Sequence, residues 1–307
     1  MSPIQPVTVA TERAAVCQSA TKLPAKRVTV PSISGHKVRD GRRPLTMITA
    51  YDAPSARMVG SSGAEMILVG DSLAMVVLGY DDTLQVTISD MAHHVAAVSR
   101  AKPTSLIVGD MPWMSYHVSV EETVRNAAML IKAGAQCVKL EGGRKRLPMI
   151  HALIDAEIPV MGHIGLTPQS VNAMGGFKVQ ARDAQSALAL VQEAKALQAA
   201  GCFAIVLEGV PDEVARMVTN ALEIPTIGIG AGVDCDGQVL VFHDVLGIED
   251  RLCPKFVRRY SDVGRVSVEA LERFVADVRD QSFPNAAESY HLAGDVSEML
   301  GLYSPAR

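Results

Sequence analysis

Eight short apolar runs, each leading into a polar side chain or a glycine turn, constrain this chain of 307 residues more than any other feature. A run such as residues 66–69, with no polar alternation, is typical of a strand buried on both faces of a parallel sheet. The side chains that follow the runs would then lie at the carboxyl ends of the strands, where parallel α/β folds bind ligands and metals. The runs and their tips are 45–50 before Asp52, 66–69 before Asp71, 105–109 before Asp110, 137–138 before Lys139 and Glu141, 159–162 before His163, 202–207 before Glu208, 226–230 ending in a glycine turn, and 238–242 before His243 and Asp244.

Helix signals alternate with these runs and predict an α/β fold, a single (β/α)8 TIM barrel, which needs ~250 residues. The expected domains are a flexible N-terminal arm (1–27), a catalytic barrel with C-terminal helices (28–282) and a C-terminal tail (283–307). We expect residues 28–38 to pack across the barrel floor. The predicted helices cover 53–62, 89–101 with Ser89 as N-cap, 121–133, 147–156, 183–200, 212–222, 254–260 and 266–278.

Composition excludes several classes of protein. A net charge of −4 and a pI near 6.1 give no electrostatic footprint for nucleic acid or an anionic membrane. No apolar run approaches the ~18–20 residues of a membrane span, so we expect a cytoplasmic protein acting on small molecules. The five cysteines are scattered and form no CxxC pair, which argues against a disulfide framework or a structural zinc site.

Asp71 and Asp110 are the first candidates for chemistry, because they follow neighbouring strands and would meet at one rim. Two close carboxylates repel each other unless a cation lies between them, and hard oxygen ligands suit Mg²⁺. A lone aspartate after a strand is more often a helix cap or turn former, but several acids at successive strand ends favour the metal site. A zinc site is disfavoured, since no HxH or HExxH motif is present.

Three further residues have competing interpretations. Lys139 and Glu141 alternate across Leu140 and point to the same side of their strand. In one interpretation Lys139 binds a substrate carboxylate and Glu141 completes the outer shell of the metal. In the other the two residues form a structural ion pair only with each other. Glu208 follows six uncharged residues, which suits a general base near neutral pH. His163 is either a hydrogen-bonded scaffold residue or a catalyst. The long, glycine-bearing stretch 165–182 predicts a lid or binding loop.

A set of motifs resembles the ketopantoate hydroxymethyltransferase family, in that family's order and over residues 28–260. The motifs are Ala50-Tyr-Asp52, Gly70-Asp-Ser-Leu73, Val77-Leu-Gly-Tyr-Asp81, Lys139-Leu-Glu-Gly-Gly143, Gly162-His-Ile-Gly-Leu-Thr-Pro-Gln-Ser170, Gly176-Phe-Lys-Val-Gln180, Leu207-Glu-Gly-Val-Pro211, and Gly228-Ile-Gly-Ala-Gly232 with Asp236-Gly-Gln238. The resemblance implies transfer of a hydroxymethyl group from 5,10-methylenetetrahydrofolate to 3-methyl-2-oxobutanoate, giving 2-dehydropantoate for pantothenate and coenzyme A synthesis through an enolate stabilised by Mg²⁺. It also implies a homo-oligomer, commonly a decamer.

The resemblance also implies roles for individual residues. Asp71 and Asp110 would be metal ligands that also contact substrate, with Glu141 near the metal through water. Ser72, Lys139 and His163 would line the substrate pocket, and Glu208 would be the base. The sequence departs from the family's usual residues at Ala74, Gln85, Phe177 and Ala181, none of which is a reacting group.

Two rival functions remain open at the level of sequence. A magnesium-dependent carbon–carbon lyase of the isocitrate lyase or phosphoenolpyruvate mutase type would share the barrel, the metal and the 2-oxo acid, but it would need no folate. A catalytically silent scaffold would be expected to lose Asp71, Asp110 or Glu208, and all three are present.

Overall fold

The computed structural model describes residues 27–248 and 254–292. The predicted N-terminal arm lies almost wholly outside these ranges, and so does most of the predicted C-terminal tail. The described chain divides into two compact units, one ending at Val239 and the other beginning at Leu240. The predicted domain boundaries stay a prediction. No helix in the described ranges combines the length and apolar character needed to cross a membrane.

Eight parallel strands pair in sequence order and close into a barrel, which confirms the predicted (β/α)8 fold. β3, β4 and β5 run far enough to include their polar residues, so Asp110, Glu141 and His163 are held by the sheet itself. The eighth run is shorter than predicted, because Phe242 begins a helix whose first turn is favoured by Asp244. The strands are β1 (Leu45–Thr49), β2 (Met66–Val69), β3 (Leu106–Asp110), β4 (Cys137–Glu141), β5 (Val160–Gly165), β6 (Ala204–Glu208), β7 (Thr226–Ile229) and β8 (Gly237–Leu240).

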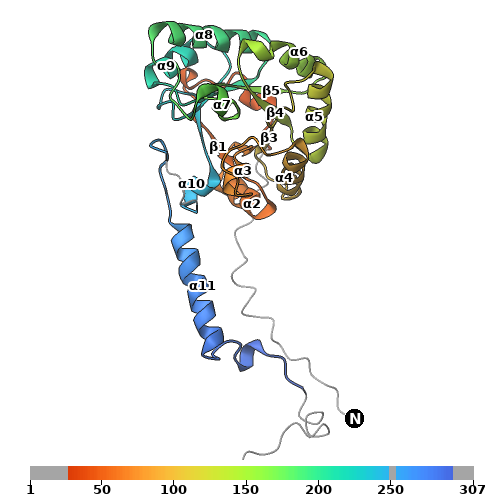
Figure 1. Cartoon of the computed structure of the whole chain (residues 1–307), viewed down its shortest axis with the longest axis vertical. Helices are drawn as coiled ribbons and strands as arrows, with labels where there is room; N and C mark the ends of the chain where they lie inside the picture. The colour runs from red at the N-terminus through yellow and green to blue at the C-terminus, as the bar shows by residue number, and fades with distance from the viewer. Residues whose placement is uncertain (1–26, 249–253, 293–307) are drawn as a thin grey trace, which may run out of the picture. The chain divides into compact units, whose positions relative to one another are not determined.

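Helices follow the strands, and α4, α5, α6, α8 and α9 lie around the outside of the strands (Figure 1). The N-cap of α4 is Thr87, not Ser89, because the Thr87 hydroxyl accepts the Asp90 amide while the Asp90 carboxylate accepts the Thr87 amide. The helices of the barrel unit are α1 (Val30–Ile33), α2 (Ala53–Ser62), α3 (Leu73–Val76), α4 (Ile88–Arg100), α5 (Val120–Ala133), α6 (Leu147–Asp155), α7 (Val171–Met174), α8 (Ala184–Ala199) and α9 (Asp212–Asn220), with 3₁₀ turns η1 (Val38–Asp40), η2 (Arg144–Arg146) and η3 (Pro168–Ser170).

The second unit contains α10 (Phe242–Leu246), α11 (Val263–Arg279) and η4 (Ala286–Glu288). The helix predicted over 254–260 is wrong, since this segment holds only a turn. Its backbone amides make turn and loop hydrogen bonds instead of helical ones: Val257 N donates to Pro254 O, and Tyr260 N donates to Val245 O in α10.

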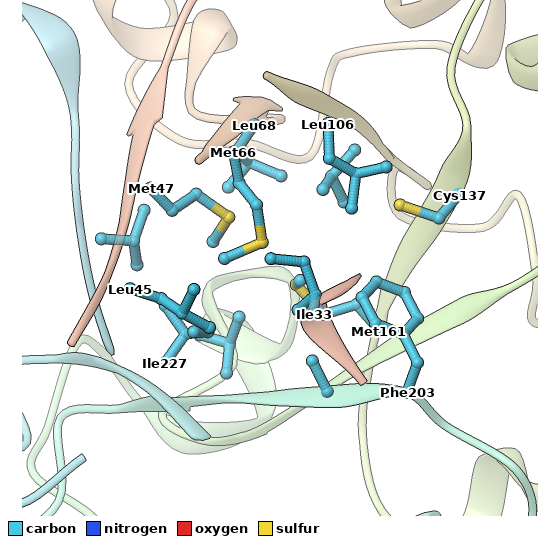
Figure 2. Close-up of a cluster of buried hydrophobic side chains, with 14 residues drawn as sticks. Ile33, Leu45, Met47, Met66, Leu68, Leu106, Cys137, Met161, Phe203 and Ile227 are labelled. Atoms are coloured by element: carbon cyan, nitrogen blue, oxygen red, sulfur yellow. The ribbon is translucent and has the colours of Figure 1, made fainter. Parts of the chain in front are cut away.

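Residues 28–38 pack across the amino-terminal end of the barrel, as predicted. Val28 N donates to Thr104 O at 2.8 Å, just before β3. Ile33 is 1% exposed and lies among side chains from the starts of the strands (Figure 2). This apolar cluster closes the floor, so the polar strand ends at the opposite rim are left to bind ligands. The cluster includes Leu45, Met47, Met66, Leu106, Cys137, Met161, Phe203 and Ile227.

Candidate active site

The register of the barrel brings the predicted site residues to one rim. Asp110 at the end of β3 pairs with Lys139 on β4, and Glu141 at the end of β4 pairs with His163 on β5. Gly165 at the end of β5 pairs with Glu208 at the end of β6. Groups that are far apart in sequence therefore meet because they occupy equivalent places on neighbouring strands.

Lys139 pairs with Asp110 more closely than with Glu141. Its Nζ lies 2.6 Å from Asp110 Oδ1 and 4.0 Å from Glu141 Oε1, and all three side chains are buried. The interpretation in which Lys139 and Glu141 pair only with each other is therefore wrong. Asp71 joins the group through its backbone, since Asp71 N donates to Asp110 Oδ2 at 3.2 Å.

His163 lies between two glutamates. Its Nδ1 is 3.4 Å from Glu141 Oε1 and its Nε2 is 3.2 Å from Glu208 Oε2, although neither contact has the angles of a good hydrogen bond. Burial lowers the pKa of His163, but the interactions with the two carboxylates raise it more, to about 9. The protonated ring would balance part of the negative charge at the rim.

Negative charge is in excess at this rim. Burial raises the pKa of Asp110 to about 7, because Lys139 offsets only part of the desolvation and Asp71 adds repulsion. Burial and the neighbouring Glu141 likewise raise the pKa of Asp71. Lys139 has a raised pKa, since the attraction of the surrounding carboxylates outweighs burial. Such a site favours the binding of a further cation.

Asp71 and Asp110 are the carboxylates that could hold Mg²⁺. Within residues 27–248 and 254–292, no three His, Cys, Asp or Glu side chains are arranged to hold a metal ion by themselves. Mg²⁺ is usually bound through one or two carboxylates, with water and substrate oxygens at the other positions. Two buried aspartates in an excess of negative charge fit that pattern, with Glu141 close by.

Two residues that the sequence did not single out complete the site. The Gln169 side chain donates from Nε2 to Asp71 Oδ2 at 2.9 Å, and the Tyr116 hydroxyl donates to Gln169 Oε1 at 2.6 Å. Gln169 N also donates to Glu141 Oε2 at 3.0 Å. Neither residue ends an apolar run, so the strand pattern contains no signal for them.

The remaining predicted residues divide between site and scaffold. Ser72 follows Asp71, and its Oγ lies 2.9 Å from the Tyr51 hydroxyl. Asp52, the tip of the first run, is a scaffold residue, because its carboxylate caps α2 by accepting Ser55 N at 2.7 Å. His243 and Asp244 lie on α10 of the second unit.

The stretch predicted as a lid follows β5 and contains η3 and α7. It returns to the barrel where Gln180 N donates to Gly209 O at 2.9 Å. Its middle exposes Phe177 and Val179, which are 49% and 53% exposed. Ala181 has a positive φ of 54°, a conformation that glycine adopts more readily.

Comparison with known proteins gives the same family as the motifs. The sequence profile of ketopantoate hydroxymethyltransferase matches residues 27–286. The 3-methyl-2-oxobutanoate hydroxymethyltransferase 2 of Bradyrhizobium diazoefficiens is 51% identical over 287 residues, which are 94% of this chain and 97% of that protein. The 3-methyl-2-oxobutanoate hydroxymethyltransferase of Syntrophobacter fumaroxidans is 54% identical over 278 residues, or 90% and 98% of the two chains.

Solved structures with a similar fold are more distant in sequence. A phosphonopyruvate hydrolase complex with oxalate and Mg²⁺ has a TM-score of 0.55 and 14% identity, covering 89% of this chain and 95% of that one. The 2,3-dimethylmalate lyase of the PEP mutase/isocitrate lyase superfamily has a TM-score of 0.52 and 15% identity, covering 90% and 95%. At this level of identity the likeness shows the barrel fold alone.

Proposed function

Because this chain belongs to the ketopantoate hydroxymethyltransferase family, whose enzymes serve pantothenate biosynthesis, we propose that it transfers a hydroxymethyl group from 5,10-methylenetetrahydrofolate to 3-methyl-2-oxobutanoate. The observation that carries the proposal is the buried rim in which Lys139 stands among Asp71, Asp110 and Glu141. An excess of carboxylates around one lysine suits the joint binding of a divalent cation and an anionic 2-oxo acid.

Different residues of the rim would bind the metal and the substrate. Asp71 and Asp110 would hold Mg²⁺, which would supply Lewis-acid stabilisation of the charge that develops on the keto oxygen. Lys139 is a fixed cation that can bind the substrate carboxylate. Ser72, held by the Tyr51 hydroxyl, can donate to a second substrate oxygen.

Glu208 is the residue that would remove the proton from C3 of the 2-oxo acid. Its side chain is 17% exposed, so it stands at the boundary between the buried rim and the space above it. His163 Nε2 lies 3.2 Å from Glu208 Oε2, so a protonated His163 would stabilise the ionised form of this carboxylate. A positioned base of this kind typically contributes ~10²- to 10⁴-fold to the rate.

The direct experiment measures 2-dehydropantoate formation from 3-methyl-2-oxobutanoate, with and without methylenetetrahydrofolate and after chelation of divalent metal. We expect product only when both folate and Mg²⁺ are present. Full activity in a chelated preparation would refute the metal's role, and cleavage of a dicarboxylate without folate would favour the lyase alternative. The cytoplasmic location and the decameric assembly stay predictions.

A further inference from the structure

Gln169 lies outside the strands and contacts two of the rim carboxylates. It lies in η3, four residues beyond the end of β5, and is 4% exposed. Its side-chain amide donates to Asp71 Oδ2 and to Met111 O, each at 2.9 Å. Its backbone amide donates to Glu141 Oε2 at 3.0 Å. One residue of the loop after β5 therefore holds two of the rim carboxylates.

The orientation of the Gln169 amide is fixed by its partners. Met111 O is a carbonyl oxygen and can only accept, so the NH₂ end must point toward it and toward Asp71. The Tyr116 hydroxyl gives its single proton to Gln169 Oε1 at 2.6 Å and accepts Glu141 N at 3.1 Å. Rotating the amide by half a turn would place oxygen against oxygen at Met111 and at Asp71.

We propose, on the basis of the function proposed above, that Gln169 is a positioning residue: with Tyr116 it holds Asp71 and Glu141 in the arrangement that binds the divalent cation and the 2-oxo acid. Partners that orient metal-binding carboxylates typically change metal affinity by ~10- to 100-fold. Because Gln169 also belongs to the stretch 165–182, the position of this loop and the occupancy of the cation site would be coupled.

The test compares Gln169→Met with Gln192→Met. Methionine has nearly the length of glutamine but cannot donate a hydrogen bond. Gln192 lies on α8, outside the stretch 165–182, and its side chain is exposed. The two variants therefore make the same chemical change at a positioning site and at a control site.

Cation affinity is measured by titrating Mn²⁺ into each folded variant in the presence of 3-methyl-2-oxobutanoate and without folate, so that no turnover occurs. We expect Gln169→Met to weaken Mn²⁺ binding by ~10- to 100-fold and to lower kcat more than it raises the KM for the 2-oxo acid, while Gln192→Met matches the parent. Equal Mn²⁺ affinity in the two variants would overturn the proposal. A parent protein that neither binds Mn²⁺ nor turns over would instead refute the proposed function.

Tyr116→Phe supplies a second test that leaves Gln169 in place. Removing the hydroxyl takes away the partner of Gln169 Oε1, while Met111 O and Asp71 Oδ2 still hold the NH₂ end, so Mn²⁺ affinity should fall by a smaller factor than in Gln169→Met. The double variant should bind no more weakly than Gln169→Met alone, because the two residues act through the same carboxylates. Losses that multiply independently in the double variant would contradict a shared positioning role.

Discussion

Two buried lysine–aspartate pairs lie at opposite ends of the barrel, and their surroundings differ. At the floor, Lys37 pairs with Asp236 at 2.5 Å, with side chains 2% and 1% exposed. At the rim, Lys139 pairs with Asp110 at 2.6 Å, with side chains 4% and 1% exposed. Distance and burial are nearly the same, so only the neighbouring groups can distinguish their roles.

The floor pair is fully satisfied. Lys37 Nζ donates also to Thr219 O and Ile224 O, at 2.9 and 3.2 Å. Asp236 accepts Val38 N and Thr226 N, at 2.9 and 3.0 Å. One cation meets one anion, and the other partners are backbone groups and the neutral Thr226 hydroxyl, which leaves nothing for a ligand to add. We conclude that this pair anchors the segment before β1 to the start of β8.

The charges around the Lys139–Asp110 pair at the rim do not balance. Asp71 and Glu141 add negative charge beside Asp110, and only Lys139 and a protonated His163 oppose it. A buried excess of one charge is unfavourable until a ligand balances it. The same pair of residue types therefore stabilises the fold at one end, whereas at the other end it lies in an excess of negative charge that we propose a ligand balances.

The largest expected effect on stability comes from breaking the Lys37–Asp236 pair at the floor. Asp236→Asn leaves Lys37 as a buried charge without a counterion, and breaking a buried pair in this way typically lowers stability by about 3–5 kcal/mol. Urea unfolding should therefore show a large decrease in the free energy of unfolding. The fraction that stays folded should keep the parent's kcat. Parental stability in this variant would mean that the floor pair anchors nothing.

The matched change at the rim should have the opposite pattern. Asp110→Asn removes one of several repelling carboxylates, while Lys139 keeps Glu141 as a neighbour at 4.0 Å. We expect stability in the presence of chelator to equal or exceed the parent's, and product formation to fall by more than about 100-fold. A destabilisation as large as that of Asp236→Asn would remove the distinction between the two pairs.

The smallest expected effect, measured per pH unit, is a pH dependence of stability that comes from the rim alone. The pKa of Asp110 rises on folding from 3.8 to about 7, so the folded protein binds more protons than the unfolded chain between these values. Stability should fall as pH rises through this window, by at most about 1.4 kcal/mol per pH unit for one group. The slope should disappear in Asp110→Asn. Urea unfolding of the metal-free protein between pH 4 and 7 measures it, and an unchanged slope in the variant would contradict this assignment.

A second contribution of the same sign comes from His163. Its pKa rises on folding from 6.5 to about 9, so its protonated form stabilises the fold fully below 6.5. This stabilisation is lost as pH rises through about 9. The decline in stability above pH 7 should therefore survive in Asp110→Asn, which separates the two groups.

Much of the barrel could be predicted from sequence because each strand is a local signal. Apolar runs are read from adjacent residues, and parallel topology then brings Asp71, Asp110, Lys139, His163 and Glu208 to one rim. Local signals are ambiguous where one residue type serves two purposes. Asp52 and Asp71 both follow a strand, yet the first is a helix cap and the second belongs to the site.

Contacts between loops could not be predicted. Gln169 and Asp71 are separated by 98 positions, and Lys37 and Asp236 by 199. A lone glutamine or lysine in an irregular segment has no periodicity that would reveal such a partner. These contacts became visible only when the closed barrel placed the segments together.

Exchange of the C3 hydrogen of 3-methyl-2-oxobutanoate tests the chemistry of the rim most directly. In heavy water with Mg²⁺ and without folate, the parent protein should replace this hydrogen with deuterium, because proton removal precedes transfer of the one-carbon unit. Glu208→Gln should slow the exchange by ~10²- to 10⁴-fold. Binding of Mg²⁺ and the 2-oxo acid, measured by calorimetry, should stay unchanged, and Glu213→Gln on the exposed side of α9 should match the parent. Exchange at the parental rate in Glu208→Gln would contradict the assignment and make His163 the first alternative base.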